Sequence, residues 1–119
     1  MKRGIDSLLE EARSLIARPT PEQAHAAMLD GALLVDVRSA DEQREQEAVI
    51  PGALHHPLSV VLWRLDELPR KTRVTLICRH GYSSSLAAAH LSVLGFEEPA
   101  DVLGGVEAWQ AAGLPVSRP

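Results

Sequence analysis

Two short apolar segments constrain the fold of this chain more than any other feature. Residues 32–37 (Ala-Leu-Leu-Val-Asp-Val) and 74–77 (Val-Thr-Leu-Ile) are nearly continuous apolar runs, without the alternation of a half-exposed strand. Such runs are typical of strands that are covered on both faces, as in parallel sheets packed between helices. We therefore expect both segments to be buried strands of an α/β domain.

Helical patterns alternate with these strands along the whole chain. Thr20, Pro21 and Gln23 form a helix start, with a capping residue, a proline at the first helical position and a capping-box partner. We expect helices over residues 5–17, 21–29, 39–47, 58–65, 85–94 and 106–112, and short strands after residues 50–54 and over residues 100–103. This alternation predicts a parallel sheet with helices on both faces. Right-handed crossovers then bring the segments after Val37 and Ile77 to one edge, where α/β sheets bind ligands.

The N-terminal segment is amphipathic. Ile5, Leu8, Leu9, Ala12, Leu15 and Ile16 fall on one helical face. We interpret residues 1–18 as a helical extension and residues 19–119 as the domain itself. A partner-binding or dimer helix is the alternative, and packing on the domain is favoured because an apolar stripe usually faces a core.

Composition excludes several function classes. The 119 residues have the size of one domain, and the net charge of -4 with no Lys/Arg block argues against a nucleic-acid partner. No apolar run approaches the length of about 20 residues that crosses a membrane, so no membrane association is expected. The single cysteine forbids an intrachain disulfide and fits a cytoplasmic location. His25, His55, His56 and His90 lack metal-ligand spacing, so no metal site is expected.

Cys78 is the candidate reactive group. It follows the strand 74–77 and opens the segment Cys-Arg-His-Gly-Tyr-Ser-Ser, which precedes a helix. Gly81 gives the loop the freedom to curl, and backbone amides at a helix start stabilise an anion such as a thiolate. The alternative is a small buried hydrophobic cysteine. The polar, cationic loop with Arg79 and His80 favours a nucleophile.

The sequence also resembles a known family. Six segments in order are similar to the rhodanese homology domain, and they cover about residues 20–117: Leu34–Arg38, Ile50–Ala53, Ile77–Ser84, Leu94–Phe96, Val102–Trp109 and Ala112–Val116. The resemblance implies a three-layer α/β fold with an about five-stranded, mainly parallel sheet flanked by helices on both faces. It also implies a rhodanese-type sulfurtransferase that works through a cysteine persulfide.

On this reading, Cys78 takes sulfane sulfur from a donor such as thiosulfate, mercaptopyruvate or a persulfide. It passes the sulfur to cyanide, a small thiol or a protein thiol, with no metal or organic cofactor. The expected substrate-binding residues are those of the loop, namely Arg79, His80, Gly81, Tyr82, Ser83 and Ser84.

Asp36 and Arg38 are expected to support the site. Asp36 is expected to hydrogen-bond loop amides or Arg38, or to cap the strand end. Arg38 is expected to pair with Glu107 across the sheet edge or to remain a solvated charge. Trp63 and Trp109 are interpreted as core or helix-packing aromatics.

Two other loop residues have open roles. His80 is expected either to act on the thiolate or substrate, or to face outward. Tyr82 is expected to line the pocket mouth or to shield the loop.

Two departures from the family pattern leave the donor open. Many rhodaneses carry a second Arg five positions after the Cys, where this chain has Ser83, and Ala48-Val49 replaces a common Gly-His pair. The change at Ser83 removes a cation that would help to bind thiosulfate. The candidates to replace this cation are Arg38, Arg44, Arg64 and Arg79.

The loop has two rival interpretations. Cysteine phosphatases and arsenate reductases need a Cys-x5-Arg loop, in which the Arg grips a tetrahedral oxyanion, and this chain has Ser84 at that position. The other rival is a non-catalytic or redox-sensing binding module on the same fold.

Overall fold

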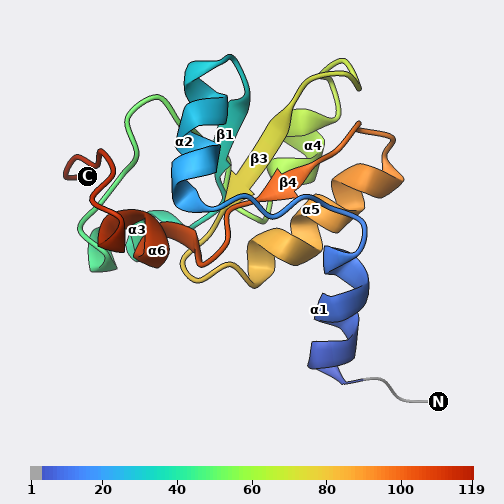
Figure 1. Cartoon of the computed structure of the whole chain (residues 1–119), viewed down its shortest axis with the longest axis horizontal. Helices are drawn as coiled ribbons and strands as arrows, with labels where there is room; N and C mark the ends of the chain where they lie inside the picture. The colour runs from blue at the N-terminus through green and yellow to red at the C-terminus, as the bar shows by residue number, and fades with distance from the viewer. Residues whose placement is uncertain (1–3) are drawn as a thin grey trace.

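The computed structural model describes residues 4–119, so the first three residues of the predicted extension lie outside the described part. Its elements alternate as the sequence predicts, and helices lie on both sides of a sheet (Figure 1). The helices are α1 (Ile5–Arg13), α2 (Pro21–Leu29), α3 (Ala40–Glu45), α4 (Val61–Leu65), α5 (Ser83–Val93) and α6 (Gly105–Ala111). The strands are β1 (Leu33–Asp36), β2 (Leu54–His55), β3 (Val74–Ile77) and β4 (Ala100–Asp101).

The sheet is parallel throughout, with strand order β2-β1-β3-β4. The two segments predicted to be buried strands, β1 and β3, lie side by side at its centre, with Leu33 opposite Val74 and Asp36 opposite Ile77. Four strands are present in the described residues, where the resemblance implies about five. Beyond β4, Ala17 makes only an isolated parallel bridge to Ala100. The α/β prediction is confirmed.

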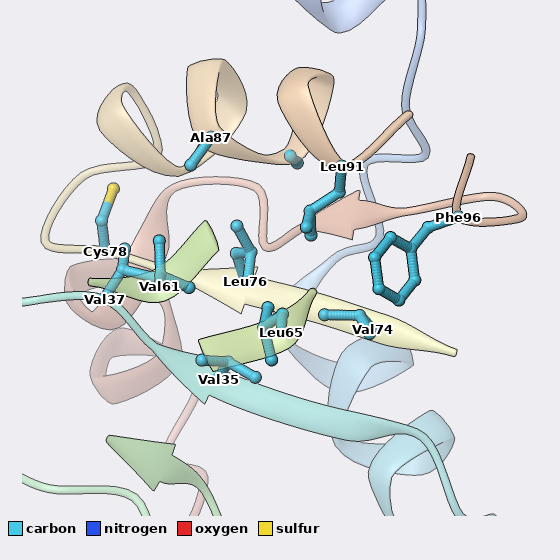
Figure 2. Close-up of a cluster of buried hydrophobic side chains, with 11 residues drawn as sticks. Val35, Val37, Val61, Leu65, Val74, Leu76, Cys78, Ala87, Leu91 and Phe96 are labelled. Atoms are coloured by element: carbon cyan, nitrogen blue, oxygen red, sulfur yellow. The ribbon is translucent and has the colours of Figure 1, made fainter. Parts of the chain in front are cut away.

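Side chains of the central strands alternate between two cores, as the two-residue period of a strand requires. On one face, Val35 of β1 and Leu76 of β3 pack with Val61 and Leu65 of α4 and with Leu91 of α5 (Figure 2). Cys78 belongs to this same cluster. The sulfur atom therefore lies at the end of a rigid, close-packed layer.

The second core lies on the other face of the sheet. Here Leu34 and Ile77 pack with Ala24 of α2 and with Val106 and Trp109 of α6. Both faces of β1 and β3 are thus covered, which explains why their sequences are continuously apolar.

The chain before the sheet departs from the prediction. The helix predicted over residues 5–17 ends at Arg13. Ala17 instead exchanges backbone hydrogen bonds with β4, donating to Pro99 O and accepting from Asp101 N, at 3.0 and 3.1 Å. An α-helix cannot satisfy these sheet-edge bonds, so the chain leaves the helix first. The other helix limits differ from the predicted ones by at most three residues, and α2 has the predicted limits and capping box.

Helix α1 packs on α5 and buries Leu9 and Ala12. This agrees with the favoured interpretation of the N-terminal segment as a packed helix. Ile5 and Leu8 remain 59% and 42% exposed, so only part of the apolar face is covered. None of the helices in residues 4–119 has the length and apolarity that crossing a membrane requires.

The two tryptophans have opposite environments. Trp109 is fully buried, its indole N–H donates to Pro115 O at 3.0 Å, and its ring meets His25 edge-on. Trp63 is 76% exposed, so of its two interpretations, core or helix-packing aromatic, the core one is wrong. Val61 and Leu65 face the core one helical turn apart, and Trp63 between them therefore points away.

Candidate functional site

Cys78 follows β3 directly and lies at the carboxyl edge of the sheet. Val37 N donates to Ile77 O at 2.9 Å, so the ends of β1 and β3 open side by side, as predicted. The Cys78 side chain is buried, with 6% exposure, and caps the α5 side of the core. The packed strand fixes the position of the sulfur, and the loop that follows determines its chemistry.

Two backbone amides point at the sulfur. Gly81 N donates to Cys78 Sγ at 3.1 Å, and Ser84 N donates at 3.5 Å. Gly81 has φ +87°, in the left-handed region that favours glycine. An amide cluster of this kind, at the start of an 11-residue helix, can hydrogen-bond an anion that forms at the sulfur.

The loop carbonyls point the opposite way and are held by α6. Val106 N donates to Cys78 O at 2.8 Å, and Glu107 N donates to Arg79 O at 3.2 Å. Gly105, with φ +63°, permits this approach, because a Cβ there would lie 2.4 Å from Cys78 O. With their carbonyls bonded to α6, these peptides present no oxygen lone pairs to a sulfur anion.

Helix α5 begins at Ser83, two residues before the predicted start, so Ser83 and Ser84 belong to its first turn. Ser83 is exposed, and Ser84 is fully buried. The Cys78 thiol donates to Ser84 Oγ at 3.1 Å, and Ser84 Oγ donates to Asp101 Oδ2 at 2.9 Å. Ser85 Oγ donates to the same carboxylate oxygen at 2.8 Å.

Asp101 is a site residue that sequence reasoning missed. It is fully buried on β4, and Arg18 Nε pairs with its Oδ1 at 2.9 Å. Arg18 and Arg13 also each donate to Gly81 O, at 3.1 and 2.9 Å. The partners are 63 to 83 residues apart in sequence, so no local pattern signals them.

A pocket of about 100 Å³ opens over the sulfur. It is lined by Val37, Arg38, Glu42, Leu58, Cys78, Arg79, His80, Tyr82 and Ser83. Four of the six predicted loop residues thus line the pocket, while Gly81 and Ser84 act from beneath through their amides.

The basic side chains at the pocket mouth have carboxylate partners. Arg79 pairs with Glu45, and His80 Nδ1 lies near Glu107 Oε2, each at 2.7 Å. The outward-facing reading of His80 therefore fits, although its ring still borders the pocket. Tyr82 is 57% exposed and lies at the pocket mouth, as predicted, with the Arg13 guanidinium 5.6 Å from its ring centre.

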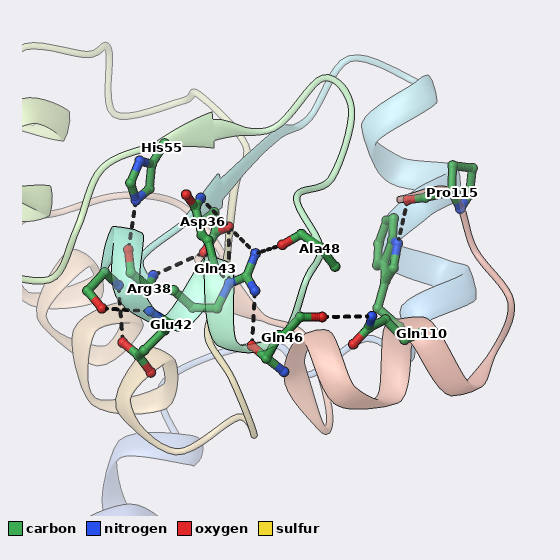
Figure 3. A network of polar contacts seen from close by, with 11 residues as sticks. Asp36, Arg38, Glu42, Gln43, Gln46, Ala48, His55, Gln110 and Pro115 are labelled. Atoms are coloured by element: carbon green, nitrogen blue, oxygen red, sulfur yellow. Dashed lines mark hydrogen bonds and ion pairs between the residues drawn. The ribbon is translucent and has the colours of Figure 1, made fainter. Parts of the chain in front are cut away.

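Arg38 and Asp36 form a buried ion pair. Arg38 Nη2 and Nε donate to Asp36 Oδ2 and Oδ1 at 2.7 and 3.0 Å, and Arg38 Nη2 also donates to Ala48 O (Figure 3). The prediction that Asp36 binds Arg38 is confirmed. Both expectations for Arg38, a pair with Glu107 and a solvated charge, are wrong, because Arg38 is 1% exposed and its guanidinium bonds to Gln46 at the end of α3 as well as to Asp36.

Three of the four arginines that could replace the family's loop Arg have carboxylate partners. Arg38 pairs with Asp36, Arg44 with Asp41, and Arg79 with Glu45. Arg79 alone of these three reaches the pocket with an accessible side chain. Within residues 4–119, no cluster of three or more His, Cys, Asp or Glu side chains has metal-binding geometry.

Comparison with known proteins identifies the family. Residues 20–112 match the rhodanese-like domain. The chain belongs to the rhodanese-like family. This rhodanese-like chain is 36% identical over 87 residues to a sulfurtransferase from Allochromatium vinosum, covering 73% of this chain and 79% of that protein. It is 40% identical over 98 residues to the thiosulfate sulfurtransferase GlpE of Pseudomonas savastanoi pv. phaseolicola, covering 79% and 87%.

A solved structure extends the likeness to the N-terminal helix. A Rhodopseudomonas palustris protein of unknown function, described as a possible tyrosine phosphatase, covers 98% of this chain and 96% of its own with a TM-score of 0.85 and 27% identity. The family match and the curated relatives confirm the prediction of a rhodanese-type sulfurtransferase.

Proposed function

We propose that this rhodanese-like protein moves sulfane sulfur from a donor to a thiophilic acceptor through a persulfide on Cys78. The observation that carries the proposal is the pair of amides on the sulfur, Gly81 N at 3.1 Å and Ser84 N at 3.5 Å, beneath an open pocket. These donors suit both the attacking thiolate and the anionic persulfide that replaces it.

In the first step, the Cys78 thiolate attacks the outer sulfur of the donor. An Sγ–S bond forms while the bond between the donor's two sulfurs, or the carbon–sulfur bond of mercaptopyruvate, breaks. The leaving group takes that electron pair, as sulfite from thiosulfate, a thiolate from a persulfide or the pyruvate enolate from mercaptopyruvate. The negative charge that remains on the new outer sulfur lies in the loop, where the amides and Ser84 face it.

In the second step, an acceptor nucleophile attacks the outer sulfur of the persulfide. Cyanide leaves as thiocyanate, and a thiolate leaves as a new persulfide. The electron pair of the Sγ–S bond returns to Cys78 as thiolate, so the cycle needs no metal or organic cofactor. The small-thiol or protein-thiol acceptors of this scheme fit a reducing cytoplasm, which we propose as its compartment.

The pocket mouth favours a donor of low charge. Glu45 balances the charge of Arg79, Glu107 lies against His80, and Glu42 adds a further carboxylate to the lining. Ser83 supplies a neutral hydroxyl where many relatives have a cation. A thiosulfate dianion therefore gains little attraction, and a small-molecule or protein persulfide suits the site better.

The rival functions are less well supported. In the phosphatase reading, residue 84 has to be an Arg that grips the oxyanion, and here a buried Ser84 bonded to Asp101 occupies that position. A binding module needs no amides directed at a sulfur, and here both Gly81 and Ser84 supply one.

The test is persulfide loading followed by intact mass measurement. Wild-type protein is incubated with thiosulfate, mercaptopyruvate or a protein persulfide, and we expect a gain of one sulfur atom that dithiothreitol reverses. Cys78→Ser should fold, gain no sulfur and transfer none to cyanide. Wild-type transfer rates in this variant, or failure of the wild type to load from every donor, would refute the proposal.

A further inference from the structure

We propose that Arg13 and Arg18, which precede the family-matched region, are positioning residues of the sulfur site. They hold the Gly81 carbonyl outward, and they thereby keep the Gly81 amide directed at Cys78 Sγ. The inference deepens the proposed function, since it assigns the N-terminal segment a part in preparing the nucleophile.

The first support is the bonding of one carbonyl oxygen. Gly81 O accepts hydrogen bonds from Arg13 Nη2 at 2.9 Å and Arg18 Nη2 at 3.1 Å, and it shares the single Ser85 Oγ proton, at 3.1 Å, with Asp101 Oδ2. Two of these donors are guanidinium groups, whose hydrogen bonds are stronger than neutral ones. They converge from α1 and from the segment beside β4, and neither arginine lines the pocket over the sulfur.

The second support is the backbone of Gly81. Its N–H and C=O flank the same Cα, so an anchored carbonyl limits the rotations that set the N–H direction. Gly81 has φ +87° and no Cβ, and glycine is the residue that most easily leaves such a conformation. The Gly81 amide belongs to the His80–Gly81 peptide and the carbonyl to the Gly81–Tyr82 peptide, so without the arginines both peptides would turn more freely about the Gly81 Cα, and the amide, 3.1 Å from the sulfur in the structure, would lose its fixed direction.

The third support is the buried carboxylate beneath Cys78. Asp101 is connected to the sulfur through the single hydroxyl of Ser84, at 2.9 and 3.1 Å. An unbalanced carboxylate there would disfavour a thiolate and would retain the Ser84 proton. Arg18 pairs with Asp101 at 2.9 Å and offsets that charge. Ser84 can then turn its proton to the thiolate, while Ser85 and Arg18 still bind Asp101.

The charges on the pocket side do not take over this role. Those facing Cys78 from β1, α3 and the loop are already balanced in the pairs Arg38–Asp36, Arg79–Glu45 and His80–Glu107, with Glu42 and Tyr82 completing the lining. The two arginines beneath the loop are therefore the cations placed to act on its backbone.

The experiment measures the thiolate fraction and the reactivity of Cys78 at one fixed, near-neutral pH. Because Cys78 is the only cysteine, thiolate absorbance near 240 nm and the rate of alkylation by iodoacetamide report on this residue alone. We expect Arg13→Met and Arg18→Met each to slow alkylation about tenfold and to lower the absorbance, as loss of a charge-assisted hydrogen bond predicts. Arg13→Lys and Arg18→Lys should recover most of the rate, since an ammonium can still donate to Gly81 O.

The matched control is Arg73→Met, which removes an arginine that pairs with Asp30 at the other end of β3 and should leave both readings unchanged. Arg18→Met leaves Asp101 buried without its cation, so Arg18→Met/Asp101→Asn is measured beside it. We expect this double variant to fold and still to alkylate more slowly than wild type.

Wild-type alkylation in Arg13→Met and in the double variant would overturn the inference, as would Lys variants no better than Met variants. These readings need no sulfur donor, so they separate this inference from the proposed function. A wild type that never loads sulfur refutes sulfur transfer, whereas unchanged thiol reactivity in the variants refutes only the positioning.

Discussion

The role of the Gly81 backbone can be measured by adding one methyl group. Gly81→Ala places a Cβ at a residue with φ +87°, which costs about 1–2 kcal/mol of folding free energy. That Cβ would also lie 3.0 Å from Gly104 N and 3.3 Å from Val102 O and from Arg18 Nη2. The first two are backbone atoms between β4 and α6, which have little room to retreat. Overpacking of this kind adds about 1–2 kcal/mol, for a total loss of about 2–4 kcal/mol.

Gly113→Ala is the matched control. Gly113 also has a positive φ, +73°, but a Cβ there meets nothing within 4 Å. It should therefore lose only the backbone part, about 1–2 kcal/mol. Urea denaturation of both variants gives the difference, which we expect to be about 1–2 kcal/mol in the direction of greater loss at Gly81.

The two variants should also differ in chemistry. The strain at Gly81 moves its amide from Cys78 Sγ, so Gly81→Ala should load sulfur and alkylate about tenfold more slowly, as loss of one hydrogen bond to a charged sulfur predicts. Gly113→Ala should keep wild-type rates. Equal losses of stability in the two variants, or wild-type reactivity in Gly81→Ala, would show that the contacts around Gly81 do not hold the loop.

Other substitutions test the buried parts of the fold. Arg38→Met should cost about 3–5 kcal/mol in urea denaturation, because it leaves the Asp36 carboxylate buried without its cation; a loss below about 1 kcal/mol would contradict the pairing. Trp109→Ala should also cost about 3–5 kcal/mol, since the indole is fully buried. Trp63→Ala, at 76% exposure, should change stability by less than about 0.5 kcal/mol, and comparable losses for the two tryptophans would contradict their assigned environments.

Local patterns predicted the parts of the fold whose partners are near in sequence. The capping box of Thr20 and Gln23 begins α2 where expected, because its two hydrogen bonds span only three residues. Strand β3 has the predicted limits, because a short and continuously apolar run is typical of a strand that is covered on both faces. The position of Cys78 at the carboxyl edge follows from that strand and from right-handed crossovers.

The sequence was less informative where long-range contacts override local preference. The apolar stripe of the first helix continues to Ile16, yet α1 ends at Arg13 because Ala17 bonds to the edge of β4. Residue type alone favours a core or helix-packing role for Trp63, but Val61 and Leu65 on either side of it face the core, so most of the Trp63 side chain is exposed to solvent. Arg38 is a different case, because its partner Asp36 is only two residues away and the buried pair leaves no contact with Glu107.

The same distinction between local pattern and long-range contact applies to the sulfur site. The sequence by itself determined that Cys78 begins a glycine-containing loop at the end of a buried strand, and that sulfur is the cargo its family carries. Only the tertiary structure decided what surrounds that sulfur. Arg13, Arg18 and Asp101 reach the loop because α1 packs on α5 and residue 17 joins β4, and such contacts depend on how distant segments meet in space.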